Sequence, residues 1–291
     1  HAVLLTNTSS LDVDQMASKM AHPERLAGLH FFNPVDRMPL VEIIVGARTS
    51  PAAADTALAL ARRLGKTPVV VRNAPGFLVN RILMPYLNEG LHLFRQGVHI
   101  ETLDQSMVDF GMPMGPLRLL DEIGLDVADK VSHILGAAFG DRVDPAGVLE
   151  AMVQGGRTGK KGGLGFYRYR GGEGTPDPAV YPLADRPSRD TITAGPNAWR
   201  ERMTLAMINE AARCLEETVV ESPAQVDLAM IMGTGFPPFR GGLLRHADVL
   251  GLGVVVDRLR ALTAVHGARF EPCPLLVKMA QDGYVFRPEF R

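Results

Sequence analysis

The stretch "AGLHFFNPVDRMPLVEIIVG", residues 27–46, places two apolar runs on either side of an Asn-Pro turn. The first run stops at Asn33 and is predicted to be a buried strand that leaves its sheet for a turn. The second run is rich in Val and Ile, stops at Gly46, and is predicted to be the following strand. Each run carries one titratable side chain, His30 in the first and Glu42 in the second.

A carboxylate inside a buried strand needs a partner, because burial of an unpaired charge is costly. If the two strands lie side by side, His30 is the obvious partner for Glu42. Such a contact holds one imidazole tautomer, which is how a general base is prepared. The alternative remains open that His30 is an ordinary residue of the core, as most single histidines in apolar strands are.

The composition excludes several classes of protein. With 291 residues, 46% hydrophobic and 22% charged, the chain is globular and long enough for two or three cores. Lys and Arg number 31 against 32 for Asp and Glu, a net charge of −1, so no nucleic-acid partner is expected. No apolar run approaches the roughly 20 residues of a membrane helix, and no secretory signal is visible. Two cysteines suggest neither a metal site nor a disulfide framework, and a cytoplasmic location is expected.

The chain is predicted to be α/β at first and all-helical afterwards. Residues 1–73 alternate apolar strands with helices, the pattern of a doubly wound α/β sheet. The chain begins within a strand, so only the later strands of such a sheet are expected. Residues 74–172 show helical periodicity, residues 173–195 read as a Gly- and Pro-rich linker, and residues 196–291 are helical again.

The second helical region repeats the first. The segment "ILMPYLNEGLHLF" is echoed by "MTLAMINEAARCL", which aligns Asn88-Glu89 with Asn209-Glu210. Further along, Asp104 aligns with Asp227. Two copies of this size indicate duplication of a whole helical domain, and the copies are expected to pack as a pseudo-dimer within the chain.

The motifs "TNTSSL", "GLHFFNP", "LVEII", "APGFLVNR", "MGPLRLLDEIGLD" and "GKKGGLGFYRY" occur together and in this order. The combination resembles the 3-hydroxyacyl-CoA dehydrogenase family, and the repeat with "GFPPFRGG" is similar to the C-terminal part of its multifunctional fatty-acid oxidation members. Those members carry an enoyl-CoA hydratase ahead of the dehydrogenase. The resemblance implies that residues 1–73 are the C-terminal portion of a Rossmann-type NAD-binding domain. It also implies two repeated dehydrogenase C-terminal domains, NAD as cofactor and an acyl-CoA substrate. It further implies a thiolase subunit as partner.

The resemblance also assigns roles to individual residues. His30 matches the family's catalytic base and Glu42 the carboxylate that orients it. Ser9 matches the hydroxyl that contacts the substrate's 3-oxygen near the nicotinamide, and Asn80 matches the amide that helps to place the substrate. Asn33 and Lys161 match NAD contacts, so that Ser9, Asn33 and Lys161 form the expected cofactor set.

Several of these residues have alternative interpretations. Ser9 is a candidate N-cap for the helix that begins "LDVDQ". Asn80 is a candidate cap at the start of the helix in which it lies. Lys161 lies in the turn "GKKGG", which also reads as an ordinary surface turn. Glu89 and Glu210 lie on predicted helices and are expected to be structural or solvated.

The implied reaction is NAD-dependent oxidation of (3S)-3-hydroxyacyl-CoA to 3-oxoacyl-CoA in fatty-acid β-oxidation (EC 1.1.1.35). The Gly-rich dinucleotide fingerprint does not occur in this sequence, so the chain alone is expected to be inactive. Two alternatives stay open. One is a related dehydrogenase, acting on 3-hydroxybutyryl-CoA in butanoate metabolism or on a sugar acid. The other is a non-catalytic module for assembly with a thiolase.

Overall fold

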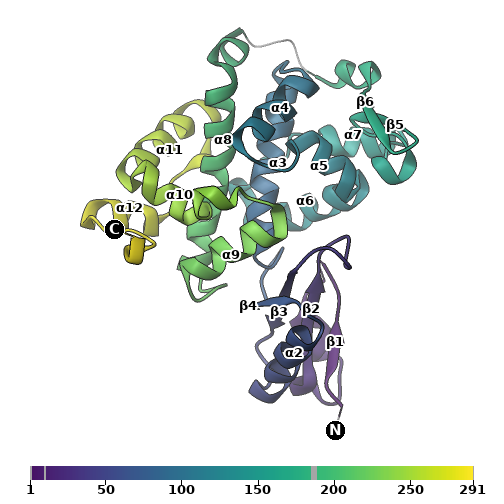
Figure 1. Cartoon of the computed structure of the whole chain (residues 1–291), viewed down its shortest axis with the longest axis vertical. Helices are drawn as coiled ribbons and strands as arrows, with labels where there is room; N and C mark the ends of the chain where they lie inside the picture. The colour runs from purple at the N-terminus through teal and green to yellow at the C-terminus, as the bar shows by residue number, and fades with distance from the viewer. Residues whose placement is uncertain (1, 10, 185–188, 291) are drawn as a thin grey trace. The chain divides into compact units, whose positions relative to one another are not determined.

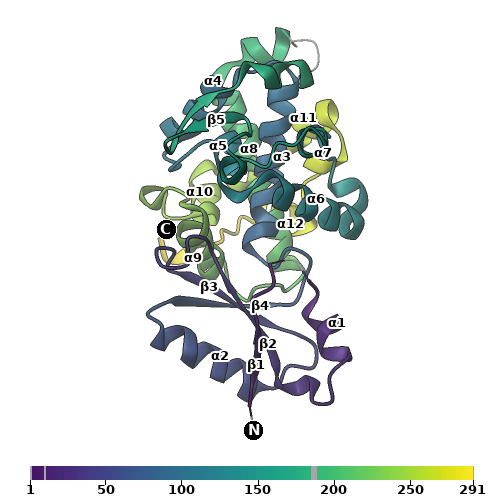
Figure 2. The ribbon, with the colours of Figure 1, turned by 90° about the vertical axis from the view of Figure 1, so that its right-hand side faces the viewer.

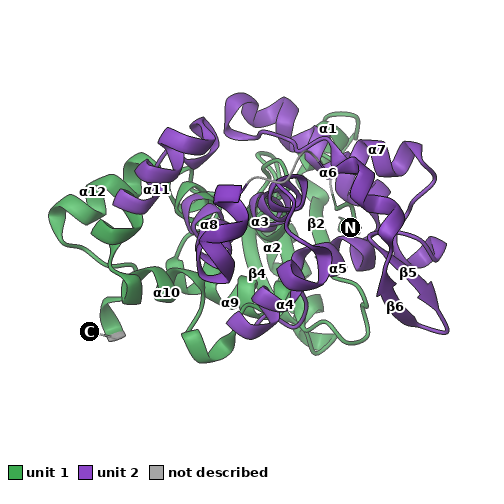
Figure 3. Cartoon of the chain, turned by 90° about the horizontal axis from the view of Figure 1, so that it is seen from above, with its two compact units in different colours: residues 1–82, 210–256, 273–291 green, residues 83–209, 257–272 purple. Residues whose placement is uncertain are grey.

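The computed structural model describes residues 2–9, 11–184 and 189–290. The chain divides into two compact units, coloured separately in Figure 3. Unit 1 contains residues 1–82, 210–256 and 273–291, and unit 2 contains residues 83–209 and 257–272. The units therefore group the chain differently from the sequence-based ranges, because parts of the second helical repeat pack with the N-terminal region.

Unit 1 begins with a four-stranded sheet in the order β1-β2-β3-β4, visible in Figure 1. Its elements are β1 (Leu4–Thr6), α1 (Val13–Ser18), β2 (Leu26–Phe31), β3 (Leu40–Val45), α2 (Pro51–Arg63) and β4 (Thr67–Arg72). β1 and β2 are parallel, as are β3 and β4, whereas β2 and β3 are antiparallel. The predicted α/β architecture is present, with one antiparallel step that the alternating pattern did not indicate. The reason is the short link between β2 and β3, which has no room for the helix that a parallel crossover needs.

Helix α2 covers one face of this sheet, as Figure 2 shows. Ser50 caps its N-terminus and Pro51 occupies the first turn, which explains where the helix begins. Its alanines at every fourth position, Ala53, Ala57 and Ala61, are buried. Small residues allow the helix to approach the sheet closely, and Ala57 and Ala61 share a core cluster with Leu29. Because side chains alternate along a strand, His30 points to the opposite face from Leu29.

The rest of unit 1 is helical. It contains α9 (Pro223–Thr234), α10 (Leu243–Leu250) and α12 (Pro274–Asp282), with short 3-10 turns at Pro238–Arg240 and Pro288–Phe290. Helix α9 packs on β3 through Gly233, where a side-chain carbon would lie 2.7 Å from the Leu40 side chain. A glycine at this position lets the helix lie directly against the sheet.

Unit 2 is built mainly from helices: α4 (Ile100–Phe110), α5 (Pro116–Ile123), α6 (Leu125–Phe139) and α7 (Val148–Gln154). It also holds the hairpin β5 (Tyr167–Arg170) and β6 (Glu173–Pro176) and short 3-10 turns at Gly140–Arg142, Lys160–Gly162, Pro178–Leu183 and Ala268–Phe270. Three long helices run through both units: α3 (Val79–Arg95), α8 (Arg189–Glu216) and α11 (Leu252–His266). The predicted helical periodicity of this region is confirmed. No described helix is long and apolar enough to cross a membrane.

Within the stretch 173–195, expected to be a linker, the described residues form regular elements. It supplies strand β6, a 3-10 turn and the first residues of α8, which bends at Gly195. Val180 is fully buried, and the Tyr181 ring lies 6.0 Å from the Phe94 ring. These apolar contacts fix the segment to unit 2, although its Gly and Pro content is typical of a linker. Residues 185–188 of this stretch lie outside the described residues.

Candidate active site

The structure brings His30 and Glu42 together. The antiparallel pairing of β2 and β3 sets the two residues directly opposite each other. His30 Nδ1 lies 2.7 Å from Glu42 Oε2, and the two side chains are 6% and 0% exposed. The contact predicted from the sequence is present, and its origin is a cross-strand register. With Nδ1–H donated to the carboxylate, the lone pair of the ring lies on Nε2.

The other oxygen of Glu42 has a partner that sequence reasoning missed. Oε1 accepts hydrogen bonds from the backbone N–H groups of Leu78 at 3.0 Å and Val79 at 2.9 Å. These amides stand at the start of α3, where N–H groups lack intrahelical partners and the helix dipole favours an anion. Glu42 therefore joins the His30 imidazole to the first turn of α3. The sequence signal available was the "PG" dipeptide just ahead of the helix, which marks a turn but does not reveal its partner.

Ser9 and Asn80 also lie in this region. The Asn80 side chain donates from Nδ2 to the backbone oxygen of Ser9 at 3.4 Å. The Ser9 side chain does not cap α1, because Asp12 accepts hydrogen bonds from the N–H groups of Asp14 and Gln15. The N-cap interpretation of Ser9 is therefore wrong, since a better acceptor stands three residues later at the actual start of the helix. Asn80 lies within the first turn of α3, whose leading amides are bound by Glu42.

Two rings flank the imidazole. The Phe32 ring centroid lies 4.7 Å from that of His30, and the Phe77 ring centroid lies 5.6 Å from it. Sequence reasoning did not single out either phenylalanine. Both rings give the imidazole apolar neighbours in addition to the Glu42 carboxylate.

The residues expected to contact NAD within unit 1 share one edge of the sheet. Ser9 follows the carboxyl end of β1, and Asn33, which is exposed, follows the carboxyl end of β2. Because β1 and β2 are parallel, these two ends meet at the same edge. Ligands of open α/β sheets bind outside the carboxyl ends of the strands, so the position of both residues fits a dinucleotide.

Lys161 belongs to unit 2 and has an acidic partner there. Its Nζ lies 2.6 Å from Asp126 Oδ1, and the lysine side chain is 53% exposed. The hydrogen bond from Lys161 lowers the pKa of Asp126. The neighbouring Lys160 pairs in the same way with Glu122 at 2.6 Å. The turn is thus held by ion pairs, and the NAD contact expected for Lys161 stays a prediction.

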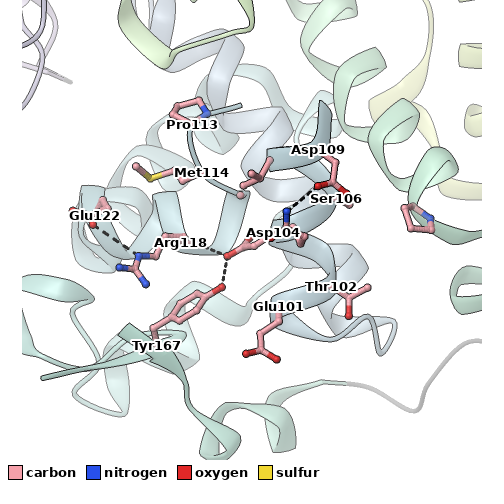
Figure 4. Close-up of a pocket in the computed structure, with 14 residues that line it drawn as sticks. Glu101, Thr102, Asp104, Ser106, Asp109, Pro113, Met114, Arg118, Glu122 and Tyr167 are labelled. Atoms are coloured by element: carbon pink, nitrogen blue, oxygen red, sulfur yellow. Dashed lines mark hydrogen bonds and ion pairs between the residues drawn. The ribbon is translucent and has the colours of Figure 1, made fainter. Parts of the chain in front are cut away.

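Unit 2 has a pocket of about 830 Å³ lined by α4, α5 and Tyr167 of β5 (Figure 4). Asp104 is its best-buried carboxyl group, and it accepts hydrogen bonds from the Leu117 and Arg118 backbone N–H groups and from the Tyr167 hydroxyl. Burial raises the pKa of Asp104 to about 6, against these three hydrogen bonds, which favour the anion. The repeat equivalent, Asp227, likewise accepts from the Leu244 N–H at the start of α10. Asp104 therefore serves first to fix the start of α5, a role that the duplication preserves.

Each repeat also contains a second carboxylate, and the two carboxylates make equivalent hydrogen bonds. Asp121 accepts from the backbone N–H groups of Phe166 and Tyr167, and Asp248 accepts from those of Phe286 and Arg287. Each carboxylate ties the end of a helical repeat back to its centre. The two repeats predicted from the sequence therefore share equivalent hydrogen bonds as well as similar sequences.

Comparison with protein families agrees with this organisation. Residues 1–74 match the model for the 3-hydroxyacyl-CoA dehydrogenase NAD-binding domain, which indicates NAD as the cofactor. Residues 76–169 and 200–290 both match the model for the 3-hydroxyacyl-CoA dehydrogenase C-terminal domain, so the helical domain is duplicated.

Solved structures show the same relationship. A 3-hydroxybutyryl-CoA dehydrogenase from Escherichia coli is 29% identical, with a TM-score of 0.80, over 96% of this chain and 75% of that one. The dehydrogenase part of multifunctional enzyme 1 from C. elegans is 28% identical, with a TM-score of 0.65, over 95% of this chain and 64% of that one. An (S)-3-hydroxybutyryl-CoA dehydrogenase from Ralstonia eutropha is 40% identical, with a TM-score of 0.55, over 58% of this chain and 60% of that one. This chain therefore spans only part of the length of each of these proteins. By its domain matches, its duplicated helical region and its structural relatives, the chain belongs to the 3-hydroxyacyl-CoA dehydrogenase family.

Proposed function

We propose that this chain supplies the general base and the substrate-positioning groups for NAD-dependent oxidation of (3S)-3-hydroxyacyl-CoA to 3-oxoacyl-CoA. The observation that carries the proposal is the buried His30–Glu42 pair at 2.7 Å, because it leaves Nε2 of the imidazole as the free acceptor. The family match and the polar residues at the carboxyl edge of β1 and β2 support it.

In the proposed reaction His30 Nε2 removes the proton of the 3-hydroxyl group while hydride leaves C3. Glu42 stabilises the imidazolium that results, and its own position is fixed by the Leu78 and Val79 amides. The Ser9 hydroxyl and the Asn80 amide hold the substrate's 3-oxygen near the base. NAD, when bound, accepts the hydride. A base in this position contributes about 10²–10⁴-fold to the rate.

The test follows formation of NADH with (3S)-3-hydroxybutyryl-CoA. Because the sequence lacks the glycine-rich turn that holds a pyrophosphate, we expect this chain alone to be inactive. The assay is therefore run on this chain alone and on a fusion in which the N-terminal strands of a family member precede it. In the active fusion, His30→Gln should lower kcat at least about 100-fold with the fold unchanged. The control is His133→Gln, since His133 is 66% exposed. A His30→Gln variant with the parental kcat would overturn the proposal.

The substrate proposal also concerns the length of the acyl chain. Structures named for 3-hydroxybutyryl-CoA and for a multifunctional enzyme both resemble this chain. We propose the fatty-acid β-oxidation substrates, on the ground of the duplicated helical region. Comparing kcat/KM for C4 and C16 3-hydroxyacyl-CoA in the fusion tests this proposal. A preference for C4 favours the butanoate alternative.

The thiolase partner is also a proposal, as is a cytoplasmic location. Size-exclusion chromatography of the chain with a purified thiolase tests the first, and a shift of both proteins into one earlier peak would support it. Separate elution at micromolar concentrations would contradict it.

A further inference from the structure

Phe77 has a backbone conformation that a bulky side chain seldom adopts. Its φ is 51°, directly after Gly76 with φ 74°, and Phe77 is only 2% exposed. The left-handed region is unfavourable for a residue with a side chain, because Cβ comes too close to the following carbonyl oxygen. Such strain persists only where the surroundings fix it, and it clusters at functional sites. The Phe77 N–H donates to the Ala74 oxygen at 2.9 Å, which closes the turn.

This turn has two consequences that meet at the same imidazole. The backbone after Phe77 presents the Leu78 and Val79 N–H groups to Glu42 Oε1, while Oε2 of the same carboxylate contacts His30. The Phe77 side chain meanwhile lies against the His30 ring, with an angle of 57° between the two planes. One residue therefore acts on the base both through the carboxylate and through a direct ring contact.

The same turn sets the position of Asn80. Because Asn80 follows Val79 in the first turn of α3, the amides that bind Glu42 and the side chain that reaches Ser9 belong to one rigid segment. A change in the turn would shift the base and the substrate-holding amide together.

We propose that Phe77 is a positioning residue for the reaction, which fixes the plane and tautomer of the His30 imidazole and aligns it with Asn80. The inference rests on the function proposed above and goes beyond it, since it assigns a role to an apolar side chain that acts through the imidazole.

The test separates the two contributions of Phe77. Phe77→Gly keeps a left-handed backbone without strain but removes the ring, so the Glu42 hydrogen bonds should survive and the ring contact should be lost. Phe77→Leu fills most of the volume but keeps the backbone strain. The first readout is the pair of ¹⁵N chemical shifts of the His30 ring in the whole chain, which reports the tautomer without substrate or NAD. The second is kcat and KM in the active fusion.

We expect one tautomer, protonated on Nδ1, in the parent. In Phe77→Gly the His30 ring signals should shift and broaden, because the Glu42 contact stays while the ring that restrains the plane of the imidazole is lost. In the fusion, kcat should fall about tenfold with KM nearly unchanged, and Phe77→Leu should recover part of both readouts. Thr218→Gly is the matched control. Thr218, with φ 56°, is the other non-glycine residue in the left-handed region among those that the structure describes. Its substitution relieves the same kind of strain and should change neither readout.

Unchanged ring shifts and kcat in Phe77→Gly would overturn the proposal. If Phe77→Gly does not fold, a Phe77→Leu variant with parental values in both measurements would overturn it equally. Failure of the proposed function gives a different result: the fusion would be inactive or insensitive to His30→Gln, while the ring shifts would still respond to Phe77.

Discussion

Arg81 in α3 pairs with Glu210 in α8, with Nε 2.7 Å from Oε1. The equivalent residues in the opposite repeats make the same pair, Arg202 with Glu89 at 2.5 Å. The arginine of each repeat thus binds the glutamate of the other, and each pair lies within one compact unit. Reciprocal contacts are the pattern of an isologous interface, which is what the predicted pseudo-dimer requires. The structural interpretation of Glu89 and Glu210 is confirmed by these pairs.

Loss of Arg202 should destabilise the protein strongly. Glu89 is 1% exposed, and although its burial alone would raise the pKa, Arg202 and Arg269 lower it. Arg202→Met keeps the apolar volume but leaves Glu89 with Arg269 alone, so the free energy of unfolding should fall by about 3 kcal/mol. Urea denaturation measures the change.

The matched control is Arg258→Met. Arg258 pairs with Glu201 at 2.5 Å, yet both side chains are about 40% exposed. An exposed pair contributes less than about 1 kcal/mol. Equal decreases in the free energy of unfolding of the two variants would show that burial of the Glu89 pair does not contribute to stability.

The turn that Asp104 fixes should not tolerate a methyl group. At Gly115 a side-chain carbon would lie 2.1 Å from the Asp104 Cα atom, which is backbone and cannot move aside. Gly115→Ala should therefore lower the free energy of unfolding by about 1–3 kcal/mol. Gly136→Ala in α6 is the control, because nothing lies within 4 Å of the added carbon. The free energy of unfolding of that variant should rise by about 0.5–1 kcal/mol, because alanine favours a helix more than glycine does. Thermal unfolding of both variants measures the two changes. A neutral Gly115→Ala variant would contradict the close approach.

His246 should make the protein less stable in acid. Burial, and then the Arg240 guanidinium, lower its pKa to about 4. Between pH 4 and the ordinary histidine value of about 6.5, the unfolded chain binds a proton that the folded chain does not, so stability rises with pH. His266, whose pKa burial also lowers to about 4, adds an effect of the same sign. The raised pKa of Asp104, about 6, acts in the opposite direction, because there the folded state holds the extra proton.

His246→Gln should therefore reduce the loss of stability between pH 6.5 and pH 4 without abolishing it. The measurement is the midpoint of urea denaturation at several pH values in this window. His133→Gln, at an exposed position, should keep the parental pH dependence. Identical profiles for all three proteins would contradict the assignment to His246.

Much of this architecture was predictable, and the exceptions have physical reasons. The His30–Glu42 contact followed from the cost of burying a lone carboxylate. The antiparallel step between β2 and β3 depended on a short connection that the alternation of strands and helices obscured. The amide partners of Glu42 are backbone groups, which carry no residue-specific signal. The left-handed conformation of Phe77 could not be predicted, because phenylalanine disfavours positive φ. Functional or strained sites are where such local preferences fail.

In the proposed mechanism Glu42 keeps Nε2 of His30 free to accept a proton, and the rate of hydride transfer in a Glu42→Gln variant decides whether it does. If the amide oxygen of the glutamine stays on the Leu78 and Val79 N–H groups, its NH₂ group faces His30 Nδ1, which must then accept. The imidazole proton moves to Nε2, so the base is lost while the shape of the site is kept. In a single-turnover experiment with the active fusion, the rate should fall about 10²–10⁴-fold with NAD binding unchanged. Hydride transfer at the parental rate would show that the pairing of Glu42 with His30 does not support the chemistry.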